Sequence, residues 1–464
     1  MFIPRIPVEV PADDIFRNDA LKREKSVDAL SQLIFGVPGG FVLSMDGSWG
    51  SGKSTFLKFL QTKLRNEGRL VVPFDAWEAD FLEEPLIALL STLESSVKEY
   101  SKSSSSHPDI AALLDRLMKT AWQLGPVVMK GAIKYVLRTD EDLETFFSSS
   151  AEKMVEMQVK RFECARKELD DFRARLGDLA QRMSEAGLGP VVFIVDELDR
   201  CRPTYAIQLL ECVKHLFKVE GVTFILAVDR GQLEKAVGVI YGMEVHAAGY
   251  LRKFFDIDYR LPDPSIESYC GYRLRAVLSL RGRSDFDKHE LSECLTLLAL
   301  SSKALSLTLR EINECCTRFV IALSAATKRR PPASALILLC VLRVKEREKY
   351  KLYTSRALTG RQLLAELPQF HQAIQGSGDD SIPALGMIYS AFATHSEVKT
   401  LIAEFSKEAD EETNESRKKQ LGWLIAYLEW MTQAFVGAPG AGFGNEIVLS
   451  MELQESFEFS ASTE

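Results

Sequence analysis

The chain has 464 residues, of which 46% are hydrophobic and 26% charged, a globular composition that excludes a wholly disordered or fibrous protein. At roughly 150 residues per domain, this length predicts about three domains, with cores large enough to fold without disulfides. The formal net charge of −8 gives no overall electrostatic case for nucleic-acid binding, although a local basic patch is compatible with it.

The cysteine and histidine spacing favours neither a disulfide framework nor a zinc site. The eight cysteines contain no C-x-x-C pair and the six histidines occur singly, so we expect reduced thiols in buried cores. No secretory signal is visible. The apolar stretch 122–137 contains Lys130 and Lys134 and is shorter than the ~20 residues that span a bilayer. We expect an amphipathic helix there, with membrane-surface attachment as the alternative, and a cytoplasmic protein.

Helical and strand patterns alternate in the first part of the chain. After an amphipathic helix that runs to Ile34, buried strands are predicted at 41–45 and 70–74, with a helix at 53–66 between them. Further apolar runs predict strands at 191–195, 222–228 and 255–261. This order favours an α/β fold, a parallel sheet flanked by helices.

The sequence between about 84 and 187 is polar and helix-forming, apart from a serine-rich stretch at 101–106 that we interpret as a flexible loop. Apolar residues recur at every seventh position toward its end and predict a long helix with a coiled-coil-like seam. We favour packing of this seam against another helix of the chain, with self-association as the alternative. The seam residues are Val155, Phe162, Leu169, Leu176 and Met183, with Ala165, Phe172 and Leu179 between them.

A glycine-rich loop separates the first strand from the helix that begins at Lys53, and it satisfies G-x-x-x-x-G-K-[ST] in the expected context. Glycines let backbone N–H groups curl around phosphates, and the helix N-terminus adds partial positive charge. We expect Lys53 to reach the β- and γ-phosphates, Ser54 to bind Mg²⁺ and Thr55 to contact the α-phosphate. The predicted nucleotide-binding residues are Gly47, Ser48, Trp49, Gly50, Ser51, Gly52, Lys53, Ser54 and Thr55.

Two carboxylates directly follow the strand at 191–195. Asp196, at the carboxyl end of a buried strand, is placed to hold Mg²⁺ through water, so Ser54 and Asp196 are the predicted metal-binding residues. The neighbouring Glu197 can orient and polarise an attacking water, which indicates hydrolysis of a nucleoside triphosphate. The alternative is that Glu197 caps the following helix.

The other catalytic predictions concern Asp229 and an arginine. Asp229 follows the next strand and is interpreted as a γ-phosphate sensor, against a simple helix N-cap. An arginine can neutralise transition-state charge, and the sequence does not select one. Asp199 and Arg200 could contact a neighbouring subunit or position Glu197. The predicted catalytic set is Lys53, Glu197, Asp229 and Arg230, with Arg200, Arg252 and Arg310 as other arginine candidates.

Together these motifs resemble the KAP family of P-loop NTPases, in a soluble, bacterial-type member. The resemblance covers about residues 15–265 and is strongest in the Asp-Glu-Leu-Asp-Arg-Cys string at 196–201. Many members carry transmembrane helices between the nucleotide motifs, where this chain has a polar insertion, and the family often has Asp at the position of Glu197. The other matching segments are 19–23, Phe-Asp-Ala-Trp at 74–77, 250–254 running into Leu-Pro-Asp-Pro at 261–264, and a weaker match at 309–312.

The resemblance gives the domains their expected roles. Helical periodicity continues beyond residue 265 to about 435, before a glycine-rich and then acidic tail. We expect the N-terminal part of the NTPase domain at 1–95, a helical insertion at 96–188, the C-terminal part of the NTPase domain at 189–264, a helical domain at 265–435 and a flexible tail at 436–464.

The leading hypothesis is Mg²⁺-dependent ATP hydrolysis that drives a conformational change or assembly. ATP is preferred to GTP because no N-K-x-D motif follows the strand ending at Val228. The resemblance implies a homo-oligomer completed by a neighbour's arginine, and a partner protein in a bacterial system such as anti-phage defence. One alternative is a nucleotide-gated scaffold with little turnover. A less favoured one is a nucleic-acid motor, suggested by basic stretches at 328–330 and 343–351 with Tyr350 and Tyr353.

Overall fold

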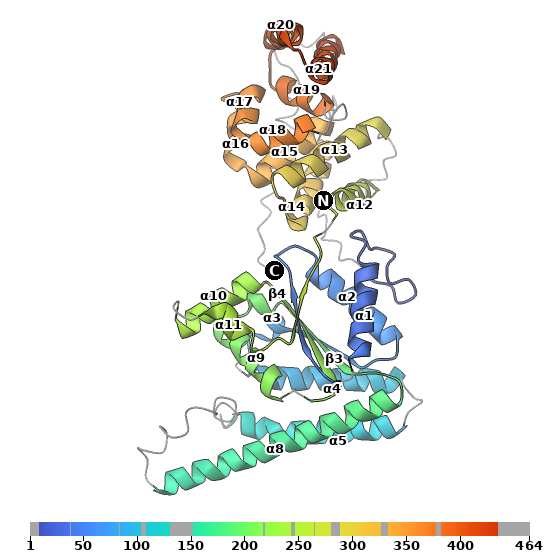
Figure 1. Cartoon of the computed structure of the whole chain (residues 1–464), viewed down its shortest axis with the longest axis vertical. Coiled ribbons are helices and arrows are strands. Elements are labelled where there is room, and N and C mark those ends of the chain that lie inside the picture. The colour runs from blue at the N-terminus through green and yellow to red at the C-terminus, as the bar shows by residue number, and fades with distance from the viewer. Residues whose placement is uncertain are drawn as a thin grey trace. The chain divides into compact units, whose positions relative to one another are not determined.

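A computed structural model describes residues 9–37, 39–82, 84–103, 108–129, 152–216, 219–242, 246–263, 265–279, 288–325, 333–376 and 382–434. The chain divides into two compact units, Ile6–Asp263 and Pro264–Glu464, the second including Met1–Arg5. Figure 1 shows a sheet wrapped by helices in the first unit and helices alone in the second. The predicted α/β fold with a helical C-terminal part is therefore confirmed.

The first unit is built on a five-stranded sheet in the order β2-β3-β4-β1-β5. All neighbouring strands are parallel, and Asp75 is in register with Asp196. The carboxyl ends of the strands therefore meet at one edge of the sheet, where residues that follow different strands come together. The strands are β1 Val42–Asp46, β2 Val71–Asp75, β3 Val191–Asp196, β4 Val222–Val228 and β5 Ile257–Arg260.

Helices cover both faces of this sheet, so its central strands read as continuous apolar runs. Alternate residues of β3 enter different cores: Val192 and Ile194 pack with α1 (Glu24–Gly36) and α2 (Lys53–Asn66). Val191, Phe193 and Val195 join the larger core on the opposite face. Among the helices that contribute to that core are α4 Pro85–Ser103, α9 Pro203–Leu216 and α10 Arg230–Tyr241, and short connections are α3 Ala76–Ala79, η1 Leu198–Arg200 and α11 Ala247–Leu251.

The predicted long helix is α8 (Glu152–Glu185), and it packs along α5 (Pro108–Met129) in the same chain (Figure 1). Its seam side chains Leu169, Phe172, Leu176, Leu179 and Met183 are all buried. Packing within the chain is thus confirmed for this part of the seam. The side chains of Val155, Phe162 and Ala165 lie outside the described residues.

Two other predictions for this region concern the loop at 101–106 and the helix at 122–137. The flexible loop predicted at 101–106 is wrong for 101–103, because α4 continues to Ser103. Tyr100 is buried there and donates to the Gly68 carbonyl, while the Ser101 hydroxyl donates to the Val97 carbonyl at 2.8 Å. Residues 104–107 and 130–137 lie outside the described ranges. Within those ranges, no helix has both the length and the apolar character needed to cross a membrane.

The second unit is helical throughout its described residues. Its central helix is α15 (Ala333–Lys345), in which every residue from Ala333 to Leu342 is buried, and α13 and α14 pack against it. The other helices here are α12 Ile266–Ser279, α13 Lys288–Ala304, α14 Leu309–Ala325, α16 Arg347–Thr354, α17 Gly360–Glu366, α18 Pro368–Gly376, α19 Ile382–Ser390, α20 His395–Glu411 and α21 Glu415–Ala434. The tail predicted at 436–464 lies outside the described residues.

The cysteines are distributed as the sequence predicts, free and mostly inside. Cys164, on α8, is exposed, and the others are buried. None of them forms a disulfide.

Candidate functional site

The loop between β1 and α2 is tightly wound. Gly50 and Gly52 have φ values of 78° and 91°, which side-chain-bearing residues rarely adopt. A Cβ on Gly47 would lie 2.9 Å from Ser51 Oγ. That hydroxyl is buried and has no hydrogen-bond partner among the described residues. The loop thus presents an uncommitted donor and a helix N-terminus, an arrangement that fits a phosphate group.

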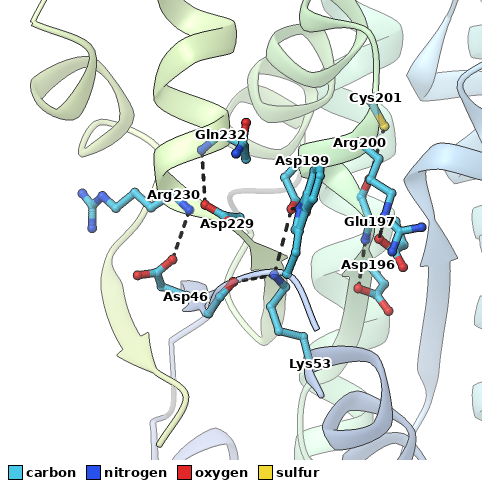
Figure 2. Close-up of polar contacts among 12 residues, drawn as sticks. Asp46, Lys53, Asp196, Glu197, Asp199, Arg200, Cys201, Asp229, Arg230 and Gln232 are labelled. Carbon is cyan, nitrogen blue, oxygen red and sulfur yellow. Dashed lines mark hydrogen bonds and ion pairs between the residues drawn. The ribbon is translucent and has the colours of Figure 1, made fainter. Parts of the chain in front are cut away.

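Lys53 begins α2 and is only 8% exposed. Its Nζ donates to the Gly47 carbonyl at 2.5 Å and lies 4.0 Å from Asp199 Oδ2 (Figure 2). The loop residues Ser48 and Trp49 precede it, and Ser54 and Thr55 follow in the first turn of the helix. The ammonium group therefore lies within the loop that is predicted to bind phosphate.

The two predicted metal-binding residues line the same cavity. Burial raises the pKa of the Asp196 carboxyl, and the nearby Ser54 hydroxyl opposes this shift. The described residues contain no group of three or more His, Cys, Asp and Glu side chains that could hold a metal. A hydroxyl and one carboxylate match Mg²⁺, which keeps waters and phosphate oxygens as its other ligands. Ser54 and Asp196 therefore fit a nucleotide-bound Mg²⁺.

Glu197 has an unusual backbone and a charged partner. Its φ is 59° and its side chain makes no cap hydrogen bond to η1, so the capping alternative is wrong. Oε2 of Glu197 lies 2.6 Å from Arg200 Nε (Figure 2). Burial and the neighbouring Asp196 raise the pKa of Glu197 to about 7, although Arg200 opposes the shift. Such a carboxyl is suited to take a proton near neutral pH.

Asp229 and Arg230 lie on the other side of the loop. The Asp229 side chain accepts from the Gln232 amide, so it caps α10. This is the N-cap that the sequence left as the alternative to a phosphate sensor. The Arg230 side chain turns toward β5, where it contacts Asp258 at 2.9 Å, and its amide donates to Asp46 Oδ1 at 3.0 Å. Among the other arginine candidates, Arg252 is next to α11 and Arg310 belongs to the second unit.

The sequence profile of the KAP family P-loop domain matches residues 23–326, which is more than half of the chain. The chain belongs to the KAP family. Among solved structures it is similar to the Aeropyrum pernix ORC2 protein in ADPNP–ADP complexes. The two share 12% identity with a TM-score of 0.35, and the match covers 98% of this chain and 97% of that one. No curated protein matches.

In this KAP domain the Asp-Glu-Leu-Asp-Arg-Cys segment contacts the loop directly, which sequence reasoning did not anticipate for Asp199. Its side chain is 1% exposed, and Oδ2 accepts from the indole Nε1 of Trp49 at 2.5 Å. Oδ1 is buried without a partner in the described residues. Asp199 therefore joins Lys53 and Trp49, both from the phosphate loop, to the strand that carries the acidic pair. The sequence signal that could have indicated this contact is the position of Asp199, an acidic residue two positions after Glu197.

The Phe-Asp-Ala-Trp segment also reaches the site. Asp75 ends β2 and caps α3 by accepting from the Glu78 amide at 2.9 Å. The ring of Trp77 lies under the Arg200 guanidinium, 5.6 Å from ring centroid to Cζ. Asp80 accepts from the amide and Nε of Arg202, at 2.9 and 3.0 Å. These contacts hold α3 against η1.

A cavity of about 650 Å³ opens beside Ser54 and Asp196. It lies along β2, the edge strand of the sheet, where Pro73 is tolerated because edge strands need fewer backbone donors. Its lining combines acidic groups with apolar side chains, of which Phe81 is 79% exposed. Besides Ser54, Pro73 and Asp196, its lining includes Asp75, Glu78, Phe81 and Leu82.

Arg23 supports the loop from the segment before α1. The residue is 4% exposed, and burial lowers the pKa of its guanidinium. Nη1 donates to the Pro262 carbonyl at 2.5 Å and Nη2 to the Ser51 carbonyl at 3.5 Å. This arginine links the 19–23 and 261–264 segments, separated in sequence, to the phosphate loop.

The structure does not favour the stretch 343–351 as a nucleic-acid surface. Tyr350 and Tyr353 are 4% and 1% exposed, so their rings are not available to stack on bases. Lys345 contacts Glu311 at 3.1 Å and Lys349 contacts Glu346 at 2.6 Å. The two tyrosines therefore give no support to a nucleic-acid surface here, and nucleic-acid binding by this stretch stays an untested alternative. Residues 328–330 lie outside the described residues.

Proposed function

We propose that the chain hydrolyses ATP with Mg²⁺ and uses the reaction to drive a conformational change or assembly. The observation that carries this proposal is the acidic pair at the end of β3. Asp196 lines the same cavity as Ser54, which follows the phosphate loop, and the residue after Asp196 is a glutamate whose pKa is raised to about 7. A protein that only bound nucleotide would need the carboxylate of Asp196 but not that of Glu197.

Each side chain has a separate part in the proposed reaction. Lys53 neutralises negative charge on the phosphates, and Ser51 and the loop amides bind their oxygens. Ser54 and Asp196 orient the metal. Glu197 holds the attacking water and accepts its proton. Bound Mg²⁺ supplies charge neutralisation on the transferred phosphoryl group.

The proposal extends to a cytoplasmic homo-oligomer that works with a partner protein in a bacterial system such as anti-phage defence. Arg200 and Arg230 are each paired with a carboxylate within the first unit. That pairing supports an arginine supplied by another copy of the chain. Asp229, an N-cap in this structure, is retained as the proposed sensor because it lies one residue after the strand next to β3.

Glu197→Gln tests the proposal, because glutamine keeps the size of the side chain and removes the base. We expect the phosphate release rate to fall by about 10²- to 10⁴-fold, with ATP still bound. Mass photometry with and without ATP·Mg²⁺ should show nucleotide-dependent assembly that the variant retains or prolongs.

Glu185→Gln, on the exposed part of α8, is the matched control and should hydrolyse ATP like the unmodified chain. A chain that turns over equally well with Gln at 197 would contradict the proposal. If neither the unmodified chain nor the Glu197→Gln variant hydrolyses ATP, and both still assemble when nucleotide is added, the nucleotide-gated scaffold is favoured instead.

A further inference from the structure

The side chain of Arg200 is placed to act on Glu197 and on no other carboxylate of the site at ion-pair distance. Its Nε lies 2.6 Å from Oε2 of Glu197, and each side chain is 20% exposed. No other ion pair of Arg200 or Glu197 is found among the described residues. The contact engages one carboxylate oxygen and leaves the other, Oε1, for a further hydrogen bond.

We propose that Arg200 is a positioning residue that fixes the Glu197 carboxylate for water activation, with Trp77 holding the guanidinium in place. This inference rests on the proposed ATP hydrolysis and adds two residues to it. It differs from a role as an arginine finger, in which Arg200 would contact the phosphate itself.

The positive charge of Arg200 offsets the repulsion that neighbouring carboxylates exert on Glu197. Asp75, Asp196 and Asp199 all act on Glu197 with repulsive charge, so an unpaired carboxylate would turn away from them. A charge-assisted hydrogen bond from a guanidinium is stronger than a neutral one and fixes direction as well. Arg200 thus keeps a carboxylate aimed into a region where its neighbours repel it.

Trp77 gives the arginine a fixed surface. Its ring lies 5.6 Å from Arg200 Cζ, within the range of a cation–π contact. The short helix that carries Trp77 is itself anchored, because Asp80, at its end, accepts from the Arg202 amide and Nε. A chain of contacts therefore runs from α3 through Trp77 and Arg200 to Glu197.

A double-mutant cycle tests this. Arg200→Ala should lower kcat by about 10- to 100-fold, the loss expected of a misplaced catalytic group, with the Kd for ATP changed less than twofold. In the Glu197→Gln background the same substitution should leave the residual rate unchanged, because the group it positions is gone. Arg200→Lys should recover part of kcat, and Trp77→Ala should cause a smaller loss that does not add to that of Arg200→Ala.

Arg182→Ala is the matched control, since Arg182 makes an i,i+3 contact with Glu185 on the exposed face of α8, at 3.1 Å. It should leave kcat unaltered. Equal losses from Arg200→Ala in both backgrounds would overturn the proposal in favour of direct phosphate contact. An unchanged kcat, or a loss confined to ATP binding, would also overturn it. Failure of Glu197→Gln alone to slow turnover would instead overturn the proposed function.

Discussion

At the scale of single residues, Glu197 combines two unfavourable conditions. Its φ of 59° lies in the left-handed region, which costs a residue with a side chain roughly 1–2 kcal/mol. Its carboxyl is also partly buried, and burial, together with the neighbouring carboxylates, raises its pKa to about 7. Such conditions are retained where the surrounding contacts enforce them, and they are concentrated at functional sites. Both conditions occur at the residue that Arg200 contacts at 2.6 Å.

The raised pKa has a consequence for stability that can be measured without nucleotide. The folded pKa, about 7, exceeds the unfolded value of 4.5, so the folded state binds the proton more tightly. This contribution is fully present below pH 4.5 and is lost as pH rises through about 7. Glu197→Gln removes the titration, so its Tm relative to the unmodified chain should rise between pH 5 and pH 8.

The expected rise in relative Tm is limited because the Glu197 side chain is partly exposed to solvent. After allowance for solvent screening, we expect on the order of 1 kcal/mol, or about 2–4 °C in Tm for a domain of this size. The measurement is thermal unfolding in EDTA at several pH values. A difference between the two proteins that stays constant with pH would contradict the assignment.

The nucleotide-binding residues could be inferred from sequence because local spacing determines their positions. Gly47–Thr55 wind into a loop after one strand, and Asp196 ends another, so parallel strands bring them together. Trp77 could not be assigned a contact, because its partner Arg200 lies in a segment 123 residues further along the chain. Asp229 shows a different limit, since an aspartate after a strand suits a helix cap as well as a phosphate sensor.

At the scale of elements, the α5–α8 pair extends the core beyond the layer of helices on the sheet. Phe172 is fully buried on α8 and belongs to the same core as Phe193 of β3 and Phe224 of β4. Those last two rings stack with their centroids 4.5 Å apart. The pair is thus part of the NTPase core in the described residues, although the sequence marks it as an insertion.

Phe172→Ala should therefore destabilise the first unit by about 3–5 kcal/mol, the cost of deleting a buried phenyl ring. Chemical denaturation in urea measures it, and the neighbouring Asp171→Ala is the control because that residue is exposed. The control should change stability by less than about 0.5 kcal/mol. Equal effects of the two substitutions would show that the seam does not support the sheet.

Strands were more predictable than helix ends. Strands buried on both faces are short apolar runs bounded by turns, and β4 coincides with the run at 222–228. The loop prediction is wrong for 101–103 because it relied on serine-rich composition, whereas α4 continues through these residues, next to the buried side chain of Tyr100. The Tyr100 hydroxyl donates to the carbonyl of Gly68, a contact that is remote in sequence.

At the scale of the whole molecule, the chain has two compact units, each with its own core. Only the first contains the phosphate loop and the acidic pair. Ligand binding stabilises the folded state by RT ln(1 + [L]/Kd), about 2.7 kcal/mol when the ligand is at 100 times Kd. The effect should be confined to the unit that binds.

Differential scanning calorimetry can separate the units. We expect ATP·Mg²⁺ to raise the transition of the first unit and leave that of the second within error. Lys53→Ala should abolish the rise, because it removes the buried ammonium that is proposed to neutralise the phosphates. Equal shifts in both transitions, or one shared transition, would show that the units unfold together.

The distribution of thiols allows the proposed conformational change to be followed by labelling the unmodified chain. Burial raises the pKa of the inner cysteines, among them Cys201, Cys212 and Cys316, and neutral thiols react slowly with electrophiles. Cys164 alone is exposed. A maleimide dye would therefore attach to α8 without any engineered cysteine. The helix pair on the NTPase core thus carries a natural position for a single spectroscopic reporter of the nucleotide cycle.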